Sequence, residues 1–288
     1  MRPTPPAITV DVEDWPQSTW DRSLPISPRA ADNANHLLDL LAELDVRATM
    51  FVLGKFARVH GNVVRRMLAE GHEVASHGDG HVEVHRMTPE EFARDLEQSK
   101  SLLEDITGEP VRGYRAPDFS IGRDHLWALD VLAESGFDYD SSIFPIRNRR
   151  YGIPDWPRGP VRVQTAHGAE LVEFPISTLR FLGRNWPLGG GGYQRLLPGW
   201  TFRMLAATAM SRGPNVFYCH PYEFDPGEFD ALDFEVPVRV RLHQGLGRRR
   251  VADRFRAFVR RFGGCRLIDL CESNDWPVYR PATDAPPQ

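Results

Sequence analysis

The chain has 288 residues, of which 41% are hydrophobic and 26% charged, a composition typical of a globular protein. Its net charge of −4 argues against a nucleic-acid-binding protein that relies on a basic surface. Three cysteines are too few for a disulfide scaffold, and we expect Cys219 to be a buried apolar residue and not a nucleophile. No stretch approaches the roughly 18 apolar residues of a membrane span. We therefore expect a single cytoplasmic domain over residues 1–288, without a nucleic-acid partner or membrane span; the oligomeric state stays open.

Strand-like and helix-like segments alternate along the first half of the chain. The helix after Thr88 has a strong start, with proline at its first position and Glu91 three residues after the cap. The alternation predicts a mostly parallel sheet with right-handed crossovers. By periodicity and end signals, strands are expected at 7–10, 48–53, 73–76 and 111–114, and helices at 33–44, 62–70, 88–106 and 125–134.

The pattern becomes less regular after Asp140. We expect an irregular insertion at 145–215, interrupted by a strand at 170–176. The four glycines at 189–192 predict a tight turn and not a phosphate loop, because no Lys-Ser/Thr pair follows them. The remaining expected elements are a strand at 215–219, a helix at 251–262, a last strand at 265–270 and a polar tail at 278–288.

Acidic and imidazole side chains occur where several strands are expected to end. They lie in Asp11-Val12-Glu13-Asp14, in His77-Gly78-Asp79-Gly80-His81 and in Phe217-Tyr218-Cys219-His220, while Arg115 follows a further strand. Carboxylates and imidazoles are the usual ligands of a hydrolytic zinc and also act as bases and acids. Because active groups gather at the carboxyl ends of parallel strands, these segments predict one site.

Each of these segments also has a simpler interpretation. A carboxylate at the end of a buried strand is costly unless it is paired or metal-bound, and Arg115 is a candidate partner for Asp11. The glycines between His77 and His81 disfavour a helix, so a loop would have to direct both rings at one point. The alternative is a pair of solvent-exposed histidines in a turn, and we expect His85 on the surface.

These motifs resemble those of the polysaccharide deacetylases of carbohydrate esterase family 4. In that family they read Thr-Phe-Asp-Asp-Gly, His-Ser/Thr-x-x-His, Arg-x-x-Pro-Tyr and an apolar strand that ends in a histidine. The corresponding segments here begin at Thr9, His77, Arg115 and Val216. Asp-Val-Glu-Asp, Arg-Ala-Pro-Asp-Phe-Ser and His-Pro-Tyr-Glu-Phe-Asp-Pro are similar to the subgroup linked to exosortase (PEP-CTERM) exopolysaccharide loci of bacteria. The resemblance implies a distorted (β/α) barrel of about seven parallel strands, and N-deacetylation of sugars in a bacterial polysaccharide or its precursor.

The resemblance also implies roles for the site residues. Asp11 would be the general base, oriented by Arg115, and His220 the acid that protonates the departing amine. His77 and His81 would bind one divalent ion, Zn²⁺ by preference, which activates the water that attacks the acetamide carbonyl.

The first motif departs from the family pattern, because Val12 separates carboxylates that are adjacent in most members. In a strand, Asp11 and Glu13 point to the same side. Glu13 is therefore the first choice for the third metal ligand, and Asp14 is an alternative if the chain turns. The family also has an acidic residue that orients the last histidine, for which Asp140 is the candidate.

Two other functions remain as alternatives. One is metal-independent hydrolysis of a small cyclic or ureido amide on the same fold, and the other is a catalytically inactive glycan-binding module. Metal analysis and acetate release distinguish them from the leading hypothesis. Aromatic rings stack on sugar faces, so a glycan cleft could use Trp15, Trp20, Trp156 and Trp186, whose alternative role is ordinary packing.

Overall fold

A computed structural model describes residues 4–165, 167–273 and 275–281 of the chain. Within these residues, a nine-stranded sheet runs in the order β10-β1-β2-β3-β4-β5-β7-β6-β11, and β6–β7 is its antiparallel pair. A separate hairpin joins β8 (Thr178–Phe181) to β9 (Arg184–Pro187). The strands of the sheet are β1 (Ala7–Val12), β2 (Thr49–Val52), β3 (Glu73–Ser76), β4 (Gly113–Tyr114), β5 (Tyr139–Asp140), β6 (Val161–Gln164), β7 (Glu170–Glu173), β10 (Val216–Cys219) and β11 (Val278–Tyr279).

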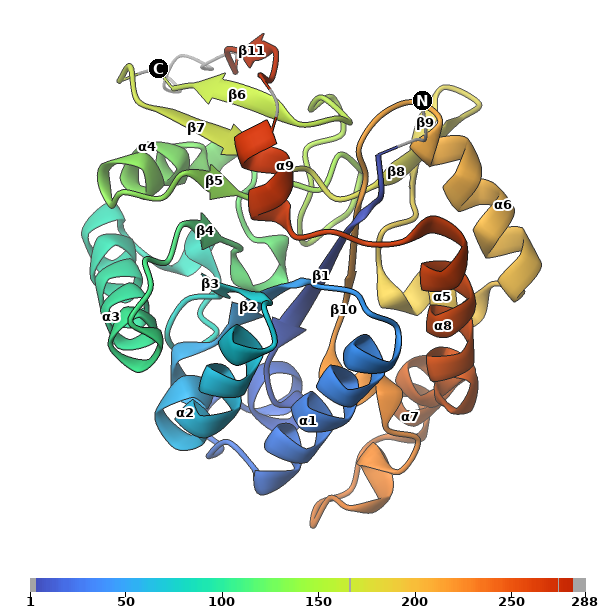
Figure 1. Ribbon diagram of the computed structural model, residues 1–288. Helices are drawn as coiled ribbons and strands as arrows, with labels where there is room; N and C mark the ends of the chain where they lie inside the picture. Colours follow the sequence, from blue (N-terminus) through green and yellow to red (C-terminus); the bar gives the residue numbers. More distant parts are fainter. Residues whose placement is uncertain (1–3, 166, 274, 282–288) are drawn as a thin grey trace.

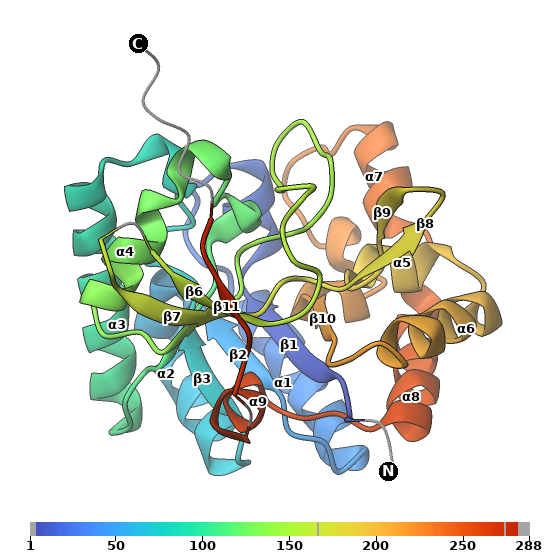
Figure 2. The ribbon, with the colours of Figure 1, turned by 90° about the horizontal axis from the view of Figure 1, so that it is seen from above.

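The sheet curls into a distorted barrel because the chain that follows β7 reaches β10 on the opposite side. Ser177 N–H donates to the carbonyl oxygen of Val216 at 3.2 Å, and Ser177 Oγ accepts from Val216 N–H at 2.7 Å. These bonds complete a ring of the parallel strands β1, β2, β3, β4, β5, β7 and β10, in which β1 and β10 lie side by side (Figures 1 and 2). The predicted barrel class is confirmed.

Helices surround the barrel (Figure 1). Side chains alternate along β1: Ile8, Val10 and Val12 belong to the outer core under the helices, whereas Ala7 belongs to the barrel interior. Asp11 therefore points into the barrel. The helices are α1 (Pro28–Glu43), α2 (Gly54–Ala69), α3 (Pro89–Thr107), α4 (Trp127–Glu134), α5 (Gly191–Leu196), α6 (Gly199–Met210), α7 (Val238–Gly245), α8 (Val251–Phe262) and α9 (Leu267–Ser273).

Local end signals account for several helix boundaries. α1 begins before the predicted residue 33, because Ser27 Oγ accepts from Ala30 N–H at 3.3 Å and Pro28 occupies the first helical position. α3 has the predicted capping box at Thr88, and it ends at Gly108, whose φ of 72° suits glycine.

The predicted last strand at 265–270 is wrong, because Leu267–Ser273 forms helix α9. Leu267 N–H donates to Thr49 Oγ1 at 2.8 Å, and Ile268 N–H donates to Glu73 Oε2 at 3.1 Å. The amino end of the barrel thus satisfies N–H groups that a first helical turn leaves free. The period of a six-residue segment with only three aliphatic residues cannot distinguish a strand from a buried helix.

The segment 145–215 is more regular than predicted. It contains β6 to β9, α5 and α6, and β7 is one of the barrel strands. Val278–Tyr279 of the predicted polar tail form β11 beside β6, while 282–288 lie outside the described residues. Among the described helices, none combines the length and apolar character needed to cross a membrane. The expectation of a single domain stays a prediction.

Candidate metal and catalytic site

Most of the predicted site residues meet at the carboxyl ends of the barrel strands. Asp11 lies near the end of β1 and Glu13 directly after it, His77 follows β3, Arg115 follows β4, and His220 follows β10. All are buried except the His220 side chain, which is 18% exposed. The strand ends thus bring together residues that are more than 200 positions apart.

Glu13, His77 and His81 form a cluster that can hold a metal ion, since their ligand atoms all lie within 4.8 Å of one another. Glu13 Oε2 is 2.7 Å from His81 Nε2 and 3.6 Å from His77 Nε2. Within the described residues, this buried oxygen lacks a partner in hydrogen-bond geometry. A buried carboxylate oxygen in that state is costly unless an ion binds it. One carboxylate and two imidazoles are a donor set that suits a catalytic zinc with an open position.

The segment around the two histidines is held in place by its surroundings. His77 Nδ1 lies 2.8 Å from the carbonyl oxygen of Arg115, which can only accept, so Nδ1 carries the proton and Nε2 faces Glu13. Gly78 has φ of 73°, and a Cβ there would lie 2.9 Å from Asp95 Oδ2. A glycine is therefore required between the histidines.

The charges of the cluster are mutually dependent. Burial alone would raise the pKa of Glu13, but the imidazoles of His81, His77 and His220 hold the pKa of this carboxyl well below its usual range. Burial acts to lower the pKa of His81, and the Glu13 carboxylate raises it above the ordinary value. A metal ion bound by both residues would replace the proton on His81, so binding would release protons.

Arg115 is fully buried and fixes the orientation of Asp11. Its Nη1 donates to Asp11 Oδ1 at 2.7 Å and to Thr9 Oγ1 at 2.8 Å. Its Nε donates to the Ser141 carbonyl oxygen at 3.0 Å, and its Nη2 to Ser141 Oγ at 2.9 Å. The remaining carboxylate oxygen, Asp11 Oδ2, lies 3.9 Å from His220 Nε2. The guanidinium thus positions one oxygen and leaves the other facing the histidine.

His220 lies against Asp11 and Glu13 on one side and Glu223 on the other. Its Nε2 is 3.6 Å from Glu13 Oε1, and its Nδ1 is 3.5 Å from Glu223 Oε1. The ring stacks on Tyr222, whose hydroxyl donates to Glu13 Oε1 at 3.2 Å. Burial acts to lower the pKa of His220, but hydrogen bonding to Glu223 and the charges of Glu13, Glu223 and Asp11 raise this pKa to about 9.

Sequence reasoning missed Glu223, which occupies the position predicted for Asp140. The sequence signal for Glu223 is its position three residues after His220. A short 3₁₀ turn at Pro221–Phe224 brings the two side chains close together. Asp140 instead accepts from Ser142 Oγ and pairs with Glu173. Burial, followed by the charge of Asp140, raises the pKa of Glu173 well above its usual value, so the pair shares a proton.

Asp14 also lies outside the cluster. Its Oδ2 accepts from Ser27 N–H at 2.7 Å, and its Oδ1 accepts from Ser27 Oγ–H at 3.0 Å. Ser27 is the residue that caps α1. The side chain of Asp14 is thus used to fix the start of this helix.

The glycine run at 189–192 packs against β10 and the turn that follows it. A Cβ at Gly189 would lie 2.5 Å from the Val216 carbonyl oxygen, and a Cβ at Gly191 would overlap Glu223 Oε2. Glycine is needed wherever another chain segment approaches this closely. Gly189 and Gly190 thus pack closely against β10, while Gly191 and Gly192 begin helix α5 and border Glu223, so the predicted turn is limited to the first half of the run.

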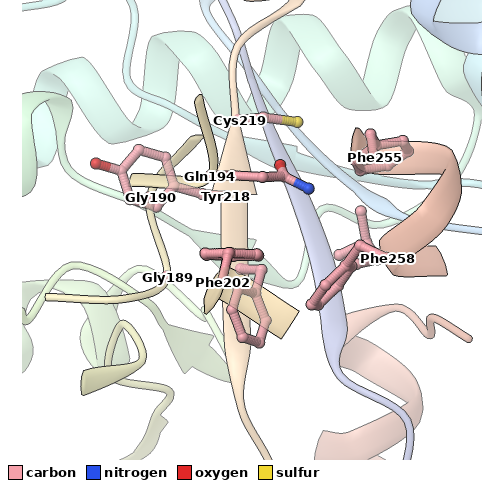
Figure 3. A pocket seen from close by; sticks show the side chains of 10 residues that line it. Gly189, Gly190, Gln194, Phe202, Tyr218, Cys219, Phe255 and Phe258 are labelled. Carbon is pink, nitrogen blue, oxygen red and sulfur yellow. The ribbon is translucent and has the colours of Figure 1, made fainter. Parts of the chain in front are cut away.

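A small apolar cavity of about 10 Å³ is lined by Gly189 and Gly190 and by residues of β10 and α8 (Figure 3). Figure 3 shows Tyr218 and Cys219 on opposite sides of the strand, with Cys219 on the side of Phe255. Burial raises the pKa of the Cys219 thiol well above its ordinary value. A thiol that stays protonated is a poor nucleophile, so the prediction of a buried apolar role is confirmed.

The four tryptophans considered above for a glycan cleft differ in exposure. Trp15 is fully buried and Trp156 is 3% exposed, so both are packing residues. Trp20 is 44% exposed and Trp186 is 53% exposed. Only the second pair remains available for stacking on a sugar.

The two halves of the chain match different family models. Residues 9–139 match the polysaccharide deacetylase family, and residues 141–271 match a domain of unknown function, DUF3473. A chitooligosaccharide deacetylase of Sinorhizobium fredii is 36% identical over 100 residues, which is 34% of this chain and 44% of that protein. A peptidoglycan-N-acetylglucosamine deacetylase of Bacillus cereus is 28% identical over 95 residues, 33% of this chain and 34% of that protein. The chain thus spans less than half the length of these relatives.

Two solved structures share the fold over most of the chain. A proposed polysaccharide deacetylase from Mycobacterium smegmatis has a TM-score of 0.57 at 22% identity, over 97% of this chain and 90% of that one. Puue allantoinase has a TM-score of 0.61 at 14% identity, over 92% and 88%. Fold and site together define a distorted α/β barrel with a carboxylate–histidine cluster at its strand ends. Residues 9–139, slightly less than half of the chain, are thus similar to the polysaccharide deacetylases.

Proposed function

We propose that the protein is a metal-dependent N-deacetylase of N-acetylated sugar residues in a bacterial polysaccharide or its precursor. The observation that carries the proposal is the convergence of Glu13, His77 and His81 beside Asp11 and His220. The match of residues 9–139 to the deacetylase family and the names of the relatives support it. The motif likeness to the exosortase-linked subgroup extends the proposal to exopolysaccharide biosynthesis.

Glu13, His77 and His81 would hold the metal, for which we propose one Zn²⁺. When bound, a divalent ion supplies a Lewis acid that lowers the pKa of water and polarises the amide carbonyl. Asp11 Oδ2, which Arg115 leaves free, accepts a proton from the attacking water. The new C–O bond forms at the acetyl carbon, the C–N bond breaks, and acetate and an amine are the products.

His220 supplies the proton that the leaving nitrogen needs. Its pKa of about 9 keeps the imidazole protonated at neutral pH. A neutral amine leaves far more easily than an amide anion, so a positioned acid speeds the cleavage. Glu223 at Nδ1 and the stacked Tyr222 ring orient the imidazole toward the cluster. The proposed acid and base are thus 3.9 Å apart, from His220 Nε2 to Asp11 Oδ2, beside the Glu13 carboxylate.

The experiment compares three variants for bound metal and for acetate released from N-acetylglucosamine oligosaccharides. His77→Ala should lose both metal and activity, and Asp11→Asn should keep metal but lose at least about 100-fold in turnover. His85→Ala, an exposed histidine of the same segment, should resemble the wild type. Full activity of metal-free protein would favour the hydrolase of small cyclic amides, and glycan binding without acetate release would favour the binding module.

A further inference from the structure

The segment between β5 and β10 is strongly basic, although the chain as a whole is acidic. Residues 145–215 contain ten arginines and three carboxylates, whereas the complete chain has a net charge of −4. Arg147, Arg149 and Arg184 are exposed, and within the described residues none of them has a carboxylate partner. An arginine whose charge is not paired inside the molecule is free to bind an external anion.

These arginines line two cavities that meet at Asn148. The first, of about 670 Å³, is lined by Arg149 and Arg150 and by residues of the loops after β3 and β4. Three carboxylates also line it: Asp118, which pairs with Arg150 at 3.1 Å, Glu83, which pairs with Arg22, and Asp124. The second cavity, of about 560 Å³, has no carboxylate in its wall, which includes Arg147, Arg180, Arg184 and Trp186.

Two sets of contacts connect the arginine-bearing segments to each other and to the catalytic centre. Asn185 Nδ2 in the β8–β9 hairpin donates to the carbonyl oxygens of Pro145 at 2.8 Å and Pro154 at 3.1 Å. Tyr151 packs on Phe119, which packs on Tyr218, which in turn contacts the His220 ring. In Figure 2 the loop after β5 rises between α4 and the β8–β9 hairpin, at the centre of the view.

We propose that the second cavity binds a carboxylate group of an acidic, N-acetylated glycan whose acetylated sugar lies at the catalytic centre. The inference rests on the proposed function of that centre. Planar guanidinium groups bind carboxylates with two parallel hydrogen bonds. Trp186, 53% exposed in the wall of the second cavity, offers an aromatic face for a sugar ring. An arginine surface that only contacts solvent does not require a cavity or an aromatic wall beside the unpaired charges.

The test compares two octasaccharides that both carry N-acetylglucosamine. Hyaluronan octasaccharide has a carboxylate on every second sugar, and chitooctaose has none. Their affinities for metal-loaded protein are measured by calorimetry at low and moderate salt. We expect hyaluronan to bind about tenfold more tightly at low salt, and this advantage to shrink as salt screens the charges. In the Arg147→Gln/Arg184→Gln double variant the advantage should disappear, while affinity for chitooctaose stays the same.

The control variant is Arg65→Gln, an exposed arginine on helix α2, and it should bind both sugars as the wild type does. Equal affinity for the two octasaccharides, or an undiminished preference in the double variant, overturns the proposal. Equally tight binding of a DNA duplex also overturns it, because the surface would then attract any polyanion. Acetate release from chitooctaose is assayed in parallel. Acetate release without tighter binding of hyaluronan refutes this inference alone. Tighter binding of hyaluronan without any acetate release refutes the proposed function alone.

Discussion

The identity of the third metal ligand gives the sharpest prediction, because two adjacent carboxylates have different surroundings. Glu13 lies against both histidines, with its Oε2 2.7 Å from His81 Nε2. Asp14 is bound to Ser27 through both of its oxygens. The matched variants Glu13→Gln and Asp14→Asn each remove one negative charge at nearly constant volume. We therefore expect Glu13→Gln to weaken metal binding and Asp14→Asn to lower stability instead.

The magnitudes follow from what each carboxylate contacts. Loss of a group that only supports a ligand lowers metal affinity by about 10–100-fold. Removing the charge of a direct ligand should cost at least the upper figure, or about 2.7 kcal/mol of binding free energy for Glu13→Gln. Asp14→Asn should leave metal affinity unchanged. It should lower the free energy of unfolding by about 1 kcal/mol, because one of two charge-assisted hydrogen bonds to the cap of α1 is weakened.

Metal affinity is measured by competition with a fluorescent zinc chelator, and stability by urea unfolding of the metal-free proteins. Comparing metal-free proteins keeps the loss of bound zinc from appearing as a loss of stability. A Glu13→Gln variant with wild-type affinity, or an Asp14→Asn variant that loses zinc, would refute the assignment of Glu13 as ligand. Equal losses in both variants would indicate that total charge, and not geometry, determines the affinity.

Two further predictions concern the proton donor and the stability of the fold. Gly191→Ala should displace the Glu223 carboxylate and lower kcat on the order of tenfold without loss of metal. Gly192→Ala, whose Cβ has space, should keep the wild-type kcat. Equal kcat values for the two variants would contradict this role of Glu223. Buried His72 accepts from Ala48 N–H at 3.1 Å, and mainly burial lowers its pKa to about 4. The unfolded chain therefore binds a proton between about pH 6.5 and 4 that the folded chain does not, so acidification through this window should cost up to about 3 kcal/mol of stability. Urea unfolding between pH 7 and 4.5 should show a smaller loss of unfolding free energy for His72→Asn than for the wild type. Parallel curves of unfolding free energy against pH would contradict this role of His72.

Local patterns predicted the mostly parallel sheet and the positions of the acidic and imidazole residues at its strand ends, whereas the barrel was implied by the family resemblance. Alternation along β1 places Asp11 inside and Val12 under the helices, as a period of two requires. The capping box at Thr88 likewise determines the start of α3 from four residues. Where the information lies within a few neighbouring residues, sequence and structure agree.

Features that depend on distant contacts could not be predicted in this way. The 265–270 run forms a helix because Thr49 and Glu73, about 200 residues earlier, accept hydrogen bonds from its first turn. Asp140 was a reasonable partner for His220 by residue type, but its carboxylate pairs with Glu173 from the neighbouring strand. In both cases the interacting residue lies on a strand elsewhere in the sheet, and the local sequence pattern contains no information about it.

The proposed catalytic centre is assembled from both of the regions that match family models. The candidate metal ligands, Asp11 and Arg115 belong to the part that matches the polysaccharide deacetylases, residues 9–139. His220 and Glu223 belong to the part that matches the domain of unknown function, residues 141–271, which also supplies Ser141 to hold Arg115. The second region therefore completes the proposed site by providing the acid, its orienting carboxylate and the support of the arginine. Since the same region carries the unpaired arginines, substitutions there should change substrate preference and proton donation, whereas substitutions in the first region should change metal binding and the base.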